Sequence, residues 1–320
     1  MSLDVRNKLF AQDPTNALWE NDLALSYEDL GNILNAQGDL DGALKMYRGS
    51  LSHRTTLAKR DVTNAEAQRN LEISNAEIGS LLLTLGDLRG AWESCTDALQ
   101  IAHKLGEKDQ NNEEWQSDIS EGSERAGDVL KAQGNFPEAR KMYLNAMSIR
   151  TNLISRDARW QMDVAKNEEE IADVFVSERE YERASELCRS AVKRGELLSA
   201  QGQKDTEVLS NLAVSYEKLG EALVGEGKPI EALINLRNSL RIFDRLLSEH
   251  ANHAEWESGM AFTCLQIAYA VRLTPTASKL EIRTYLTQGR DILLRKKQRF
   301  ALGIVDEGHL NAVENALRDL

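Results

Sequence analysis

Hydrophobic residues return along the chain in columns whose members lie 48 positions apart, or 45 between the third and fourth repeats. Three such columns, with one residue in each repeat, begin at Leu23, Leu30 and Leu34, which lie seven and four positions apart. This spacing places the residues on one face of an α-helix. Each repeat is therefore predicted to contain an amphipathic helix that starts near another column, which begins at Trp19. That column contains four of the five tryptophans of the chain. Its members are Trp19, Ala67, Trp115, Trp160, Val208 and Trp256.

Another column marks where these helices end. Aspartate or asparagine follows it in the first three repeats, at Asp39, Asp87 and Asn135. Glycine favours the left-handed backbone that closes a helix, and Asp or Asn caps the helix that follows. Each repeat therefore predicts two antiparallel helices joined by a tight turn. The turn column consists of Gly38, Gly86, Gly134, Arg179, Gly227 and Pro275.

Small residues occupy fixed positions within both helices of each repeat. Gly127 belongs to one such column, and Ala139 belongs to another. Backbones approach closely where such residues meet, because there is little side chain to separate them. We therefore expect Gly127 to face the alanine column across a close helix crossing.

The columns divide the chain into six repeats that we expect to stack as one continuous solenoid domain. Residues 4–12 match the end of a second helix 48 positions later, so we expect the chain to come from a longer array. The last repeat is degenerate, and a final amphipathic helix is expected to cap it. The predicted boundaries are 1–12 for the remnant of a preceding repeat, 13–60, 61–108, 109–156, 157–201, 202–249 and 250–300 for the repeats, and 301–320 for the capping helix.

One repeat motif resembles that of the tetratricopeptide repeat family. It consists of Tyr27-x2-Leu30-Gly31-x2-Leu34-x3-Gly38, then Ala43-x3-Tyr47-x2-Ser50. The period of 48 exceeds the family's usual 34 residues, and the closing proline of the family is absent. The resemblance implies an all-α, right-handed superhelical solenoid of six antiparallel hairpins, in which the first helix of each hairpin lines a concave face. It also implies a scaffold or adaptor that binds peptides or protein segments.

The charge and cysteine content limit the classes of partner and the cellular location that we expect. The chain has 320 residues, with 39 basic against 51 acidic side chains and a net charge of -12. Neutralising phosphates needs a basic face, so nucleic acid is not expected as a partner. No apolar stretch is long enough to span a membrane, and no secretory signal is recognisable, so no membrane partner is expected. Three widely separated cysteines fit a reducing, cytoplasmic location.

Motifs for catalysis or metal binding are weak. Gly227-Lys228 resembles part of a phosphate-binding loop, but Pro229 stands where a Ser or Thr is required. His250 and His253 lack a third ligand at fixed spacing, so a surface loop is expected there instead of a metal site. The cysteines lie in packing columns, at Cys95, Cys188 and Cys264. The interpretation is a chain without enzyme activity, cofactor or metal.

In the tetratricopeptide repeat family, certain positions of the first helix face the concave groove. The resemblance implies that twelve residues of the third to fifth repeats occupy these groove positions. Seven of these are carboxylates, which favours a basic peptide or helix as the ligand. Glu124, Glu169 and Glu217 are expected to form an exposed ladder. The alternative is a solvated helix face in an acidic protein. The candidate residues are Glu121, Glu124, Asp128, Lys131, Lys166, Glu169, Asp173, Val176, Val214, Glu217, Glu221 and Val224.

Two further hypotheses stay open. The stretch from Arg272 to Phe300 has eight basic and two acidic residues, which suggests self-association through a basic C-terminal region. A solvated cap helix is the alternative there. For the whole chain, the alternative to a scaffold is a ligand-sensing regulatory array whose effector domain lies outside this chain. An enzyme or metal protein ranks below both.

Overall fold

The computed structural model describes residues 3–155, 157, 160–200, 205–299 and 302–320. Within this described part every regular element is a helix, and no strand occurs. The helices form two compact units, Met1–Leu153 and Ile154–Leu320. The predicted all-α, tetratricopeptide-like fold of helical hairpins is therefore confirmed in each unit. The single continuous domain stays a prediction.

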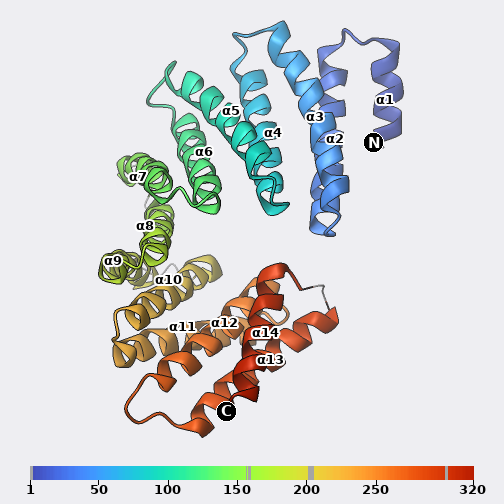
Figure 1. Ribbon diagram of the computed structural model, residues 1–320. Coiled ribbons are helices and arrows are strands. Elements are labelled where there is room, and N and C mark those ends of the chain that lie inside the picture. The colour runs from blue at the N-terminus through green and yellow to red at the C-terminus, as the bar shows by residue number, and fades with distance from the viewer. Residues whose placement is uncertain (1–2, 156, 158–159, 201–204, 300–301) are drawn as a thin grey trace. The chain divides into compact units, whose positions relative to one another are not determined.

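The first unit contains three hairpins behind a short leading helix (Figure 1). Helix α1 packs against α2, and the pairs α2/α3, α4/α5 and α6/α7 form the hairpins. The longest of these helices has 21 residues, which is about 30 Å at 1.5 Å per residue. The bounds are α1 (Leu3–Gln12), α2 (Ala17–Ala36), α3 (Leu40–Arg60), α4 (Ala65–Thr84), α5 (Leu88–Gly106), α6 (Glu113–Ala132) and α7 (Phe136–Leu153).

The second unit repeats this plan and ends in an additional helix. The pairs α8/α9, α10/α11 and α12/α13 form hairpins, and α14 packs against α12 and α13 (Figure 1). Helix α14 is thus the predicted capping helix. The bounds are α8 (Trp160–Ser177), α9 (Tyr181–Ala200), α10 (Thr206–Gly225), α11 (Pro229–Glu249), α12 (Ala254–Arg272), α13 (Lys279–Arg299) and α14 (Ile304–Arg318).

The hairpin turns follow the glycine column. Four glycines adopt a left-handed backbone, with φ between 76° and 82°. Arg179 takes the same conformation at φ 62°, which confirms its place in the turn column although it is not glycine. Pro275 lies in the longer connection between α12 and α13. Asp39 then caps α3, where its Oδ1 accepts a hydrogen bond of 2.9 Å from the amide of Gly42.

The three first helices of the first unit begin at equivalent asparagines. The side chains of Asn16, Asn64 and Asn112 each accept a hydrogen bond from a backbone amide in the first turn of the helix that follows. Such a cap satisfies a donor that the helix itself leaves unpaired. The three asparagines lie 48 residues apart, so the repeat in sequence is also a repeat in local structure.

Glycines of the small-residue column lie at tight helix contacts. A Cβ atom at Gly127 would lie 2.7 Å from Cε1 of Tyr143, so the nearest neighbour of this glycine is a tyrosine ring. Gly31 meets Tyr47 in the same way. Tyr143 is fully buried, and its hydroxyl donates a hydrogen bond of 2.7 Å to Asp128. The glycine therefore leaves room for a buried ring.

Substitution of Gly127 by leucine is expected to destabilise the first unit by about 1–3 kcal/mol, because the new side chain would overlap the Tyr143 ring. Ala132→Leu is the matched control, since Ala132 is exposed on the same helix. Thermal unfolding of both variants checks the prediction. Equal shifts in Tm would show that Gly127 is not a tight packing position.

Candidate functional site

Four carboxyl groups gather on the first helices of the second unit. Glu169 and Asp173 lie one turn apart on α8, and Glu217 and Glu221 lie one turn apart on α10. We call these four residues the acidic face. Lys218 is the cation among them, and its Nζ lies 2.8 and 2.9 Å from the two carboxylate oxygens of Asp173. The structure thus brings together four of the carboxylates that the sequence selected.

Burial disfavours the ionised form of the three glutamates of the acidic face. It raises the pKa of Glu169 to about 8 and that of Glu217 to about 7, and it also raises the pKa of Glu221. Burial opposes the charge of Lys218 as well, yet Asp173 and the neighbouring glutamates raise its pKa. Lys218 opposes the effect of burial on Glu169, Glu217 and Glu221, and a further cation would allow more of these carboxyls to ionise.

Glu217 is not the exposed contact that the sequence predicted. It is only 6% exposed, and it accepts a hydrogen bond of 2.7 Å from Thr263 of α12. Glu169 is half-buried and accepts a hydrogen bond from Ser215 of α10. Both glutamates link neighbouring first helices, which explains their burial. Glu221 and Asp173 are half-buried, so they are more exposed than Glu217.

The candidates of the first unit are held by partners in their own hairpin. Glu124 is only 8% exposed and forms an ion pair with Arg150 at 2.5 Å, so its predicted exposure is wrong. Glu121 pairs with Arg125 at 3.1 Å. The amino group of Lys131 lies 5.8 Å from the centre of the Tyr143 ring. Glu124 belongs to the first unit, and the other two members of the expected ladder belong to the second, so the ladder stays a prediction.

The remaining candidates lie on α8 and α10. Lys166 is exposed, with its Nζ 4.0 Å from Glu170. Val176, Val214 and Val224 are each half-buried. Val214 packs against the core cluster that includes Leu209 and Phe243, so it contributes to the interior as well as to the surface.

Arginines at equivalent repeat positions connect neighbouring helices, which the sequence analysis did not predict. Arg54 is 2% exposed, and its guanidinium donates to the carbonyl of Asn70 at 2.9 Å and to Ser74 Oγ at 3.1 Å. The same guanidinium pairs with Glu28. Arg54 thus ties α3 to both α2 and α4. Arg6 makes the equivalent contacts one repeat earlier, and the 48-residue match between the two arginines was the available signal.

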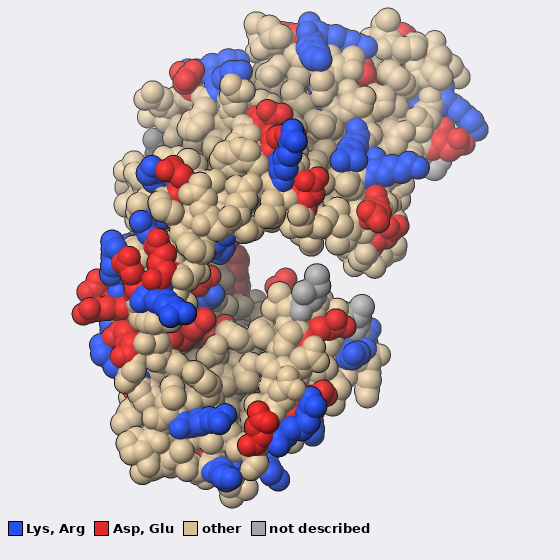
Figure 2. All heavy atoms as spheres, viewed as in Figure 1, with Lys and Arg blue, Asp and Glu red and all other residues tan. Residues whose placement is uncertain are grey.

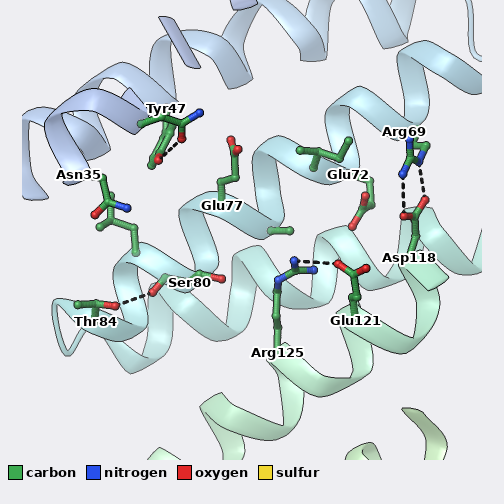
Figure 3. Close-up of a pocket in the computed structure, with 14 residues that line it drawn as sticks. Asn35, Tyr47, Arg69, Glu72, Glu77, Ser80, Thr84, Asp118, Glu121 and Arg125 are labelled. Carbon is green, nitrogen blue, oxygen red and sulfur yellow. Dashed lines mark hydrogen bonds and ion pairs between the residues drawn. The ribbon is translucent and has the colours of Figure 1, made fainter. Parts of the chain in front are cut away.

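A cavity of about 460 Å³ lies on the first helices of the first unit (Figure 3). Its walls come from α2, α4 and α6, with Tyr47 contributed by α3. Ile73, Ala76 and Leu81 line it with apolar atoms, while polar and charged side chains surround them. A volume of this size is typical of small-molecule sites. Of the twelve candidate residues only Glu121 lines this cavity.

Ion pairs fix the arginines of this cavity. Arg69 binds Asp118 through two hydrogen bonds of 2.7 and 3.0 Å, and it also pairs with Glu114 at 2.7 Å. Arg125 is held by Glu121, as the dashed lines in Figure 3 show. Two further carboxyl groups, those of Glu72 and Glu77, also line the cavity. No side chain in the described residues donates a hydrogen bond to the carboxyl of Glu72.

The weak motifs have structural roles. Gly227 forms the turn between α10 and α11, and the ring of His253 stacks on Trp256 with 3.8 Å between centroids. The three cysteines are buried. Across the described ranges, no group of three or more His, Cys, Asp or Glu side chains has the arrangement of a metal site. No helix among those residues is both long and apolar enough to cross a membrane.

The basic C-terminal stretch is partly neutralised within the second unit. Lys296 is buried and lies 2.6 Å from Asp306 of α14, and Arg299 pairs with Glu257 of α12 at 2.5 Å. Arg290 pairs with its neighbour Asp291. Acidic and basic side chains are also interspersed over the face seen in Figure 2. These pairs leave fewer cations for the predicted self-association.

Comparison with known proteins supports the repeat interpretation. The tetratricopeptide repeat family matches residues 23–60. No curated protein matches the sequence. Among solved structures, BtubC from P. vanneervenii has a TM-score of 0.62 at 16% identity, covering 82% of this chain and 94% of its own.

Two further structures share the fold at low identity. A putative kinesin light chain from Podospora anserina has a TM-score of 0.52 at 16% identity, with 72% of this chain and 98% of its own covered. A Rap protein in complex with competence and sporulation factor has a TM-score of 0.51 at 15% identity, with 99% and 78% covered. The repeated hairpins, the matched segment and the solved structures together show a tetratricopeptide-like repeat fold, which is typical of protein-interaction scaffolds.

Proposed function

We propose that the chain is a non-enzymatic interaction module that holds a basic segment of a partner protein against the acidic face of the second unit. The observation that carries this proposal is that four carboxyls of α8 and α10 lie around one lysine, Lys218. Glu169, Asp173, Glu217 and Glu221 share Lys218 as their cation. An arginine or lysine from a partner would supply a further counter-charge.

The strength of such binding is set by burial and salt. Exposed ion pairs contribute about 0.2–1 kcal/mol each, and salt screens them over about 8–10 Å. Half-buried carboxyls such as Glu169 and Glu221 are screened less than exposed ones. Val176 and Val224 are half-buried on the same helices and offer apolar contact beside the charges. Affinity is therefore expected to come from several contacts together.

The fold supports a binding role over a catalytic one. The Rap protein bound to competence and sporulation factor shows that a chain of this fold holds a ligand. We extend that role, and not that ligand, to this chain.

The test is fluorescence anisotropy with a library of labelled arginine-rich peptides and the double variant Glu169→Gln/Glu221→Gln. Loss of two carboxylates is expected to weaken binding roughly two- to tenfold at low salt. Glu207→Gln is the matched control, because Glu207 is exposed in the first turn of α10. A double variant that unfolds at the wild-type Tm and binds with unchanged affinity would remove the acidic face from the mechanism.

A second candidate function is ligand sensing by a regulatory array. The cavity among α2, α4 and α6 favours it, because that cavity has the size of a small-molecule site and contains a buried carboxyl oxygen, Oε2 of Glu77, with no hydrogen-bond partner among the described residues. Its test is direct binding of a small ligand to the first unit.

A further inference from the structure

The cavity of the first unit contains two carboxyl groups that the fold does not satisfy. Glu72 is 2% exposed, lines the cavity and receives no hydrogen bond from the described residues. The Oε2 atom of Glu77 is buried and also has no hydrogen-bond partner there. Buried polar groups are normally paired, so two such carboxyls in one cavity need an explanation.

The two carboxyls flank an apolar stripe on α4. Glu72 lies on the side of α6, near Asp118 and Glu121, whereas Glu77 lies on the side of α2 (Figure 3). Glu72 and Glu77 are five positions apart in the sequence, which is about 7.5 Å along the helix axis. Ile73 and Ala76 stand between them. The arrangement presents two carboxyl groups at the ends of an apolar floor.

Neighbouring charges do not neutralise either carboxyl. Around Glu72, the cations Arg69 and Arg125 are already bound by Asp118, Glu121 and Glu114. Burial first, and then Asp118, raises the pKa of Glu72 to about 8.

The surroundings of Glu77 come from the other side of the cavity. Glu28 of α2 faces it, together with Arg54 of α3, which is paired with Glu28, and Arg125 of α6. Burial, with Glu28 next, raises the pKa of Glu77 to about 7. A bound cation would supply both charge and hydrogen-bond donors to each carboxyl.

We infer that this cavity binds a ligand with two cationic heads joined by an alkyl stem, with Glu72 and Glu77 each holding one head. The stem lies along Ile73 and Ala76. A free linear diamine and a pair of lysines on a protein segment carry this same chemistry. The inference concerns the first unit alone and does not depend on the acidic face of the second.

The experiment is isothermal titration calorimetry of the intact chain with 1,4-diaminobutane, with butylamine as the one-headed control. A blocked peptide, acetyl-Lys-Gly-Lys-amide, forms the second arm and distinguishes the two sources. At least one of the two-headed probes is expected to bind, and more tightly than butylamine. At pH 6.5 its binding should release protons to the buffer, because the carboxyls must ionise; at pH 9 the release should disappear.

Variants decide whether the carboxyls are the ligands. Glu72→Gln and Glu77→Gln should each weaken binding about tenfold or more, as expected when one member of a buried charge pair is removed. Glu66→Gln is the control, since Glu66 is exposed on the same helix. Thermal unfolding confirms that each variant is folded. The proposal is overturned if neither two-headed probe binds, if no protons are released at pH 6.5, or if the variants bind like the wild type.

Discussion

Replacing Arg54 by methionine is expected to lower the free energy of unfolding by about 3 kcal/mol or more. The substitution keeps the apolar stem but removes the guanidinium. Glu28 then loses its cation, and the carbonyl of Asn70 and the hydroxyl of Ser74 lose a donor. Buried polar groups left without partners account for the expected loss.

Urea unfolding of the variant measures this loss. Arg48→Met is the matched control, because Arg48 is exposed on the same helix, and it is expected to change stability by less than about 0.5 kcal/mol. Adding Glu28→Gln to Arg54→Met should recover part of the loss, since the uncompensated carboxylate is then gone. Similar effects at Arg54 and Arg48 would contradict a role for the arginine in joining repeats.

The stability of the first unit is expected to fall as the pH rises from about 5 to about 8, and Glu72 is a main cause. The pKa of Glu72 is about 8 in the folded chain and near 4.5 when it is exposed. Folding therefore favours the protonated form, and the penalty grows as pH rises toward the folded pKa. The limiting slope for one such group is about 1.4 kcal/mol per pH unit.

Glu72→Gln is expected to flatten this dependence, because glutamine does not titrate. Urea unfolding of the wild type and the variant at pH 5.5 and pH 8 checks it, with Glu66→Gln as the exposed control. The free energy of unfolding of the variant should increase relative to that of the wild type as the pH rises. Parallel pH profiles would show that Glu72 is not held in its neutral form.

Repeat spacing predicted the hairpins because their signals are local. Glycines with a left-handed backbone and the capping residue Asp39 act within a few residues of the helix ends that they define. Even the non-glycine Arg179 was placed in its turn by position alone. The shortening of the repeat to 45 residues falls near the boundary between Leu153 and Ile154, where the two compact units meet in sequence.

The site was harder to predict because exposure depends on partners distant in the chain. Glu124 is buried by Arg150, which lies 26 residues later on the second helix of its hairpin. Glu217 is buried by Thr263 from the next repeat. The cavity carboxyls of Glu72 and Glu77 were not predicted, because they lie in the second repeat and the candidate residues were taken from the third to fifth repeats. The repeat columns predict on which face of a helix a residue lies, but not which charged side chain of another helix it will pair with.

The central claim is that the acidic face recognises a basic segment, and one titration tests it most directly. An arginine-rich peptide is suited to it, because its charge does not change between pH 6 and pH 8.5, whereas Glu169 and Glu217 ionise across that range. Affinity for the intact chain is predicted to rise from pH 6 to pH 8.5 and to fall as salt is added. Binding that weakens with rising pH, or that responds to neither pH nor salt, would contradict the claim.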